Sequence, residues 1–170
     1  IDDATGEVYD KVARLMGLPY PGGVNLDKMA QKGNPKAYVL PKARLQGEFD
    51  FSFSGLKTAV LNLTKKLTLD GSPLPKEDVA ASFQECITST LFGKTLKAAE
   101  KYNIKQIVLG GGVAANSEIR NKFFALREKG YKIYAPAMKY CTDNASMIAS
   151  AAYFLTNTTD SLDVEVFSRC

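Results

Sequence analysis

The spacing of apolar residues along the chain predicts both strands and helices. Gln106–Leu109 and Tyr131–Ala135 are short apolar runs bounded by glycine or proline, which is typical of buried strands. Apolar residues at helical spacing predict helices over residues 3–17, 25–31, 54–67, 75–102, 113 or 116 to 126, and 145–155. Two strand–helix units in succession predict parallel strands in an α/β fold, with a sheet that is thin for so many helices.

The residues that flank these segments predict where several helices begin. We expect Ser54 and Thr142 to be N-caps, because each hydroxyl residue directly precedes a helical pattern. Pro75 suits the entry of the long helix over residues 75–102. Pro19–Gly23 predicts a turn between the first two helices.

Three consecutive glycines, Gly110, Gly111 and Gly112, directly follow the first predicted strand. A strand, a glycine turn and a helix start together leave several backbone N–H groups unpaired, and no side chain blocks the approach of an anion. We therefore interpret the turn as a phosphate-binding site. The alternative is a tight turn that needs glycine only for its backbone conformation.

A second polar loop, Cys141–Asn144, follows the second predicted strand. The carboxyl ends of parallel strands meet at one sheet edge, so we expect this loop beside the glycine turn. Asp143 is then a carboxylate near bound phosphates, where a divalent cation is expected. Alternatively, Asp143 only stabilises the dipole of the helix that follows.

Asp10, Gly22, Gly23 and Asp27 are expected around the turn between the first two helices. Carboxylates beside glycine suit sugar hydroxyls, which need acceptors. The alternative is an ordinary helix pair between Asp10 and Arg14 and a solvated Asp27.

Composition narrows the classes of protein and of chemistry. A net charge of +4 is compatible with a nucleic-acid partner, and no apolar run approaches the length of a membrane span. Three widely spaced cysteines predict reduced thiols in a cytoplasmic protein. The chain has no histidine, which excludes Ser-His-Asp and Cys-His catalysis within it. Because it begins with Ile1, we expect a fragment of a longer protein.

The sequence does not match two common nucleotide-binding motifs. Gly110, Gly112 and Ala115 loosely match the dinucleotide fingerprint, but the second strand ends in Ala135-Pro136 and not in an acidic residue. No Walker lysine follows the glycines, which excludes a P-loop.

Five motifs, in order, closely resemble the tRNA threonylcarbamoyladenosine transferase family, formerly described as O-sialoglycoprotein endopeptidase or glycoprotease. The resemblance covers essentially the whole chain and is to the carboxyl-terminal half of such a protein. The motifs are DDATGEVYDK from Asp2, YPGG from Tyr20, FSFSGLKT from Phe51, GGVAAN from Gly111 and CTDNA from Cys141.

The resemblance implies an actin-like ATPase fold of the ribonuclease-H-like class. It also implies transfer of a threonylcarbamoyl group from its adenylate to N6 of adenosine 37 in tRNAs that read ANN codons. Family contacts to ATP or threonylcarbamoyl-adenylate correspond to Asp10, Gly23, Asp27 and Asn116, with Gly110–Gly112 near the phosphates. The family's metal-binding aspartate corresponds to Asp143, with iron or zinc as the usual metal.

The resemblance also implies partners and a division of the chain. The expected partners are tRNA, the other proteins of the threonylcarbamoyladenosine-forming complex, and the amino-terminal half of the same protein. Residues 1–104 would form the helical part of the second lobe with a family insertion, residues 105–156 a β-α-β-α nucleotide-binding core, and residues 157–170 a loose tail.

One departure from the family bears on activity. The family's metal-binding histidines lie in the amino-terminal half, and this chain has none. One carboxylate does not hold a transition metal firmly, so we expect little or no transferase activity from these 170 residues alone. Two alternatives are a non-catalytic nucleotide-binding module of a complex and a glycoprotein metalloprotease. The second has no chemical support here, since HExxH and every histidine are missing.

Overall fold

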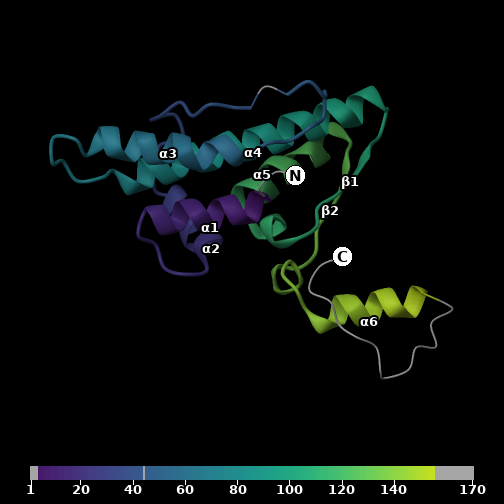
Figure 1. The fold of residues 1–170 in the computed structure, drawn as a ribbon. Helices are drawn as coiled ribbons and strands as arrows, with labels where there is room; N and C mark the ends of the chain where they lie inside the picture. Colours follow the sequence, from purple (N-terminus) through teal and green to yellow (C-terminus); the bar gives the residue numbers. More distant parts are fainter. Residues whose placement is uncertain (1–3, 44, 156–170) are drawn as a thin grey trace.

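The computed structural model describes residues 4–43 and 45–155. These residues form mainly helices, with two strands late in the chain (Figure 1). The elements are α1 (Thr5–Leu15), α2 (Gly22–Ala30), α3 (Ser54–Leu67), α4 (Lys76–Lys101), β1 (Gln106–Val108), η1 (Gly112–Ala115), α5 (Ser117–Ala125), η2 (Leu126–Lys129), β2 (Lys132–Tyr134), η3 (Met138–Tyr140) and α6 (Ala145–Phe154), where η marks a short 3-10 helix.

The long helix α4 is the centre of the molecule, and α1, α2 and α3 pack together around its first half (Figure 1). Val79, Phe83 and Ile87 recur at four-residue spacing on α4 and are fully buried. Val8 and Val12 of α1 join the same core.

Glu77 and Asp78 lie in the first turn of α4, where the helix dipole favours acidic residues.

A second, smaller core joins the end of α4 to the sheet. β1 and β2 are parallel, with Ile107 opposite Ile133, and both isoleucines are buried against α4 and α5. The side chains of Val108 and Tyr134 point to the other face of the sheet and are 69% and 51% exposed. The prediction of a helix-rich α/β fold with parallel strands is therefore confirmed for the described residues, which form a two-stranded sheet.

Three predicted boundaries are wrong. α2 begins at Gly22 and not at Asn25, so both glycines of the expected turn are helical. Ser54 is the first residue of α3, and Phe53 occupies the N-cap position. Asn144, not Thr142, caps α6, because its Oδ1 lies 3.0 Å from the N–H of Met147, three residues ahead.

Glycine is required at position 22 because α1 and α2 approach closely there. A Cβ at Gly22 would lie 2.7 Å from both the Cβ of Ala13 and Oδ1 of Asp10. We expect Gly22→Ala to lower the free energy of unfolding by about 2 kcal/mol, as overpacking does. Gly55→Ala in α3 is the control, since nothing lies within 4 Å of its added Cβ. Urea denaturation checks both, and equal stability of the two variants would contradict the prediction.

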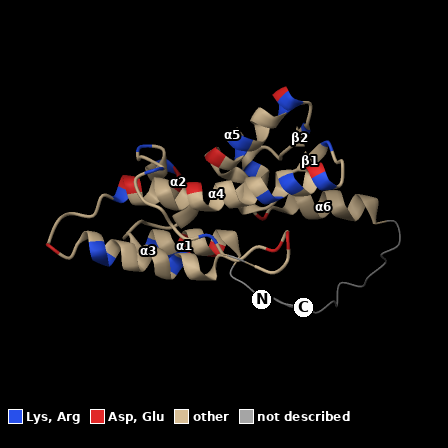
Figure 2. Ribbon diagram, turned by 90° about the horizontal axis from the view of Figure 1, so that it is seen from above, with Lys and Arg blue, Asp and Glu red and all other residues tan. Residues whose placement is uncertain are grey.

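The carboxyl-terminal part of the described chain differs from the rest. α6 has no buried residue and no charged residue, and it extends away from the helical body (Figure 1). Basic and acidic residues are interspersed along the other helices (Figure 2). Among the described residues, no helix combines the length and apolar character needed to cross a membrane. The division of the chain at residue 104 stays a prediction, and the proposed tail over residues 157–170 lies outside the described residues.

Candidate functional site

The glycine turn follows β1 directly, as the sequence predicts. Leu109 donates its N–H to the carbonyl of Tyr134 at 2.8 Å, which extends the pairing with β2 by one residue. The chain then turns through Gly110–Gly112, and Gly111 has φ 81° and ψ 173°. Side chains are strongly disfavoured in this backbone region, so Gly111 is required by conformation.

The turn presents unpaired hydrogen-bond donors. The N–H groups of Gly110, Gly111, Gly112 and Val113 donate to no acceptor among residues 4–43 and 45–155, and the three glycines are exposed. The first N–H after them that is paired belongs to Ala114, which donates to the Gly111 carbonyl at 3.0 Å. Successive free N–H groups at the start of a helix attract an anion.

Asn116 lies at the end of this turn and caps α5. Its Oδ1 accepts the N–H of Ile119 at 3.0 Å. Its Nδ2 donates to Oε1 of Gln84 at 2.8 Å and approaches Oδ1 of Asp27 at 3.3 Å. The side chain is buried, so its polar atoms are committed to the protein.

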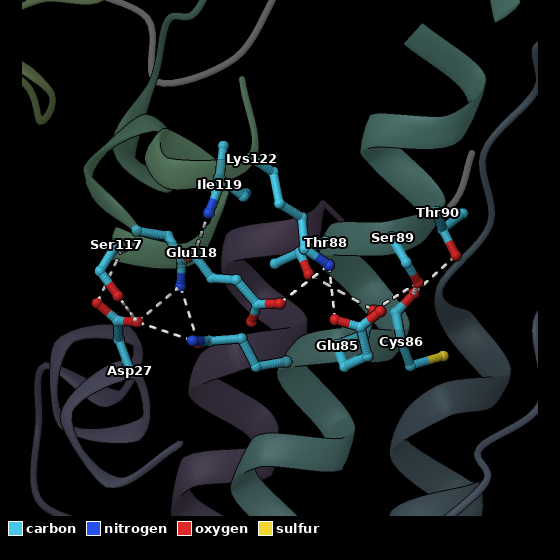
Figure 3. Close-up of polar contacts among 12 residues, drawn as sticks. Asp27, Glu85, Cys86, Thr88, Ser89, Thr90, Ser117, Glu118, Ile119 and Lys122 are labelled. Atoms are coloured by element: carbon cyan, nitrogen blue, oxygen red, sulfur yellow. Dashed lines mark hydrogen bonds and ion pairs between the residues drawn. The ribbon is translucent and has the colours of Figure 1, made fainter. Parts of the chain in front are cut away.

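Asp27 of α2 receives hydrogen bonds from α4 and α5 (Figure 3). Its Oδ1 accepts from Ser117 Oγ at 2.7 Å and from Gln84 Nε2 at 2.9 Å, and its Oδ2 accepts the N–H of Ser117 at 3.1 Å. A carboxylate offers about four acceptor positions, so Oδ2 keeps one for a ligand. The solvated Asp27 considered from spacing alone does not describe this side chain.

Tyr9 completes the buried polar cluster from α1. Its hydroxyl lies 3.4 Å from both Gln84 Oε1 and Asn116 Nδ2, and its ring meets the Phe83 ring edge-on. Burial, and then the negative charge of Asp27, raises the pKa of Tyr9 well above its ordinary value. The hydroxyl therefore stays neutral and donates a hydrogen bond to Oε1 of Gln84.

Asp10 and Gly23 form a second, separate contact. The Gly23 N–H donates to Oδ1 of Asp10 at 3.2 Å and joins α1 to α2. A Cβ added at Gly6 would lie 3.7 Å from Val113, so the start of α1 lies against the glycine turn. The structure thus pairs Asp27 with Asn116 and Asp10 with Gly23, and the start of α1 packs against η1.

Asp143 is not part of this arrangement. It is exposed between η3 and α6, and no contact joins it to the glycine turn within the described residues. The same residues include no group of three or more His, Cys, Asp or Glu side chains that could hold a metal ion. The position of its loop beside the turn stays a prediction: Asp143 itself follows η3, whereas Cys141, at the start of the loop, lies 3.2 Å from Nη2 of Arg120, whose Nε donates to the Ala114 carbonyl.

Gln84 and Ser117 are members of the cluster that sequence reasoning missed. Gln84 is 2% exposed on the face of α4 that carries Phe83 and Ile87. A polar residue at a position inside an apolar run was the available signal, since a buried amide needs a partner. Ser117 follows Asn116 directly and gave no signal of its own.

A charged group lies next to the cluster (Figure 3). Lys122 Nζ lies 2.6 Å from Glu85 Oε2 and 3.0 Å from Glu118 Oε1. Burial, followed by the hydrogen bond to Glu85, raises the pKa of Glu118. Burial acts in the same direction on Glu85, but hydrogen bonds with Glu118 and Lys122 outweigh it and lower the pKa of Glu85.

We expect Glu118→Gln to flatten the dependence of stability on pH just above pH 4.5. In that window the folded protein keeps the Glu118 proton that the unfolded chain has lost. The free energy of unfolding therefore falls as pH rises, and glutamine removes this slope. The lowered pKa of Glu85 changes the free energy of unfolding below pH 4.5, so it does not cancel the effect of Glu118. Urea denaturation across this range checks the slope, and equal slopes in both proteins would contradict the assignment.

Comparisons of the structure show what this arrangement is similar to. The crystal structure of HypF from T. kodakarensis matches with a TM-score of 0.64 over 89% of this chain and 20% of that chain, at 21% identity. A full-length HypF in a phosphate- and nucleotide-bound form matches with a TM-score of 0.62 over 94% of this chain and 21% of that chain, at 16% identity. At these identities the likeness concerns the fold.

Comparisons of the sequence are more specific. A protein named tRNA N6-adenosine threonylcarbamoyltransferase from Mesoplasma florum is 51% identical over 90% of this chain and 49% of its own length. Proteins of the same name from Thermosipho melanesiensis and a Synechococcus strain are 50% and 47% identical, over 97% and 99% of this chain. The chain spans about half the length of these relatives, 50% and 47% for the last two.

The family model described as tRNA N6-adenosine threonylcarbamoyltransferase matches residues 1–150. This range contains the glycine turn, the Asp27–Asn116 cluster and Asp143. The chain therefore belongs to the tRNA N6-adenosine threonylcarbamoyltransferase family.

Proposed function

We propose that the full-length protein transfers a threonylcarbamoyl group from threonylcarbamoyl-adenylate to N6 of adenosine 37 in tRNAs that read ANN codons. This chain is its nucleotide-binding half, a lobe of the actin-like ATPase type. Family membership supports the reaction, and the strand–glycine turn–helix arrangement supports the lobe. The expected location is the cytoplasm.

One observation carries the proposal: the unpaired N–H groups of Gly110–Val113. They fit the phosphates of ATP or of the adenylate. In the transfer step, N6 of the adenosine bonds to the carbamoyl carbon and loses a proton, while the bond from that carbon to the phosphate oxygen breaks. The AMP that leaves gains negative charge on its phosphate. Preorganised N–H donors stabilise that charge as it develops.

The carboxylates of the site suit the ribose of the same nucleotide. Asp27 keeps an acceptor position on Oδ2, and Asp10 has its Oδ1 occupied by Gly23 and its Oδ2 left for a hydroxyl donor. Asn116 acts mainly by holding Asp27 and the start of α5 in place, because its own polar atoms are already bonded. Asp10, Gly23, Asp27 and Asn116 then fix the nucleoside while the turn binds phosphate.

The iron or zinc ion of the family does not fit the described residues alone. Asp143 is a single exposed carboxylate, and no group of three metal-binding side chains occurs among residues 4–43 and 45–155. A transition metal needs several preorganised ligands. The amino-terminal half would supply the remaining ligands, and the other proteins of the modification complex and the tRNA are the remaining partners.

The proposal is tested with the full-length protein, threonylcarbamoyl-adenylate and a tRNA that reads ANN codons. The modified nucleoside, measured by mass spectrometry after digestion of the tRNA, is expected with the full-length protein and not with residues 1–170 alone. If the full-length protein binds ATP but never modifies tRNA, even with its partner proteins, the transferase proposal is wrong. The protein is then a non-catalytic nucleotide-binding module.

A further inference from the structure

Arg120 of α5 connects the segments that follow the two strands. Its Nε donates to the carbonyl of Ala114 at 2.7 Å, and its Nη2 donates to the carbonyl of Pro136 at 2.5 Å. The same Nη2 lies 3.2 Å from Sγ of Cys141, which is buried. One half-buried guanidinium therefore contacts η1, the end of the second strand segment and the residue that precedes Thr142.

These contacts fix the position of the backbone that directly follows the glycine turn. Ala114 is the first residue after the free N–H groups of Gly110–Val113, so a fixed Ala114 carbonyl fixes where those groups point. Cys141 leads into the loop that carries Asp143. A guanidinium is a rigid planar fork that bonds several acceptors at once, which a lysine ammonium on a flexible stem does not reproduce.

We propose that Arg120 is a positioning residue that sets the orientation of the phosphate-binding turn and its spacing from the Cys141–Asn144 loop. This inference rests on the proposed function of the glycine turn. Arg120 itself donates to none of the acceptors of the glycine turn: its guanidinium bonds to Ala114, Pro136 and Cys141 and packs on the Phe124 ring.

The test compares Arg120→Ala, Arg120→Lys and the control Arg127→Ala in the full chain. Arg127 also donates to a backbone carbonyl, that of Ile133 at 2.7 Å, and also packs on the Phe124 ring, but it contacts neither the turn nor Cys141. Calorimetric titration measures ATP affinity, and hydrogen exchange without ligand measures protection of residues 110–116. Methylguanidine is added to Arg120→Ala to replace the missing group.

We expect Arg120→Ala to weaken ATP binding about tenfold, as loss of charged hydrogen bonds to a positioning contact does. Exchange at residues 110–116 should become faster, Arg120→Lys should recover little, and methylguanidine should restore part of the affinity. Arg127→Ala should leave both readouts unchanged.

The outcomes separate the two proposals. If the wild-type chain binds ATP and Arg120→Ala binds it equally well, or exchange at the turn is unchanged, the role of Arg120 is overturned and the nucleotide site stands. If Arg127→Ala produces the same losses, the effect is one of general packing and the inference also fails. If the wild-type chain binds no ATP, the proposed function fails first and the positioning role fails with it.

Discussion

Gly111→Asp is expected to abolish measurable ATP binding. A carboxylate at this position would lie among the N–H groups that we assign to phosphate, and two like charges about 4 Å apart repel by about 4 kcal/mol at an effective dielectric constant of about 20. Affinity should therefore fall by at least about a hundredfold. The substitution also strains the backbone, since Gly111 has φ 81°. Calorimetric titration with ATP measures the loss.

Gly130→Asp is the matched control for Gly111→Asp. Gly130 has the same φ of 81° and nothing within 4 Å of an added Cβ, but it follows η2 and not β1. The control adds the same charge at another glycine with positive φ, where a side chain is strained, so stability should fall while ATP affinity is kept. Unchanged ATP affinity in Gly111→Asp, or an equal loss in Gly130→Asp, would contradict the assignment of the phosphates to this turn.

Asp27→Ala is expected to lower the free energy of unfolding by about 3 kcal/mol, because Ser117 and Gln84 lose the acceptor of three hydrogen bonds in a partly buried cluster. The contacts join α2 to α4 and α5, so the start of α5 should loosen and ATP binding should weaken as well. Urea denaturation measures the first effect and calorimetry the second.

Two further variants separate the causes of the Asp27 effect. Asp143→Ala removes an exposed carboxylate that bonds to nothing described, so stability should not change. Asp27→Asn keeps the volume and one acceptor oxygen. Its NH2 group replaces the other oxygen and faces a hydrogen-bond donor, so the loss of stability should be intermediate. If Asp27→Ala unfolds at the same urea concentration as Asp143→Ala, the cluster does not hold the helices together.

The elements that sequence reasoning predicted well depend on local patterns. Ile107 and Ile133 lie in short apolar runs and do pair in a parallel sheet, and the long apolar stripe around Phe83 does form α4. Gly110–Gly112 form the expected turn, because three consecutive glycines directly after a strand favour a backbone turn. For such features, the residues that determine the structure lie within a few positions of one another.

The remaining features depend on contacts between distant residues. Asp27 and Asn116 are 89 residues apart in the chain, and no spacing rule predicts that they meet. Position 22 needs glycine because α1 packs closely there, which depends on Ala13 and Asp10 across the contact and not on the turn-like sequence around it. The position of Asp143 was inferred from sheet topology, which orders the strands but does not determine the path of a loop that contains its own short helix.

The central claim is that the glycine turn after β1 binds the phosphates of a nucleotide. Calorimetric titration of the wild-type full chain with ATP and, separately, with NAD, both with Mg²⁺, tests it most directly. The account predicts saturable binding of one ATP per chain and no binding of NAD, because the acidic residue that holds a dinucleotide ribose is missing after the second strand. A folded chain that gives no heat of binding with ATP would contradict the account.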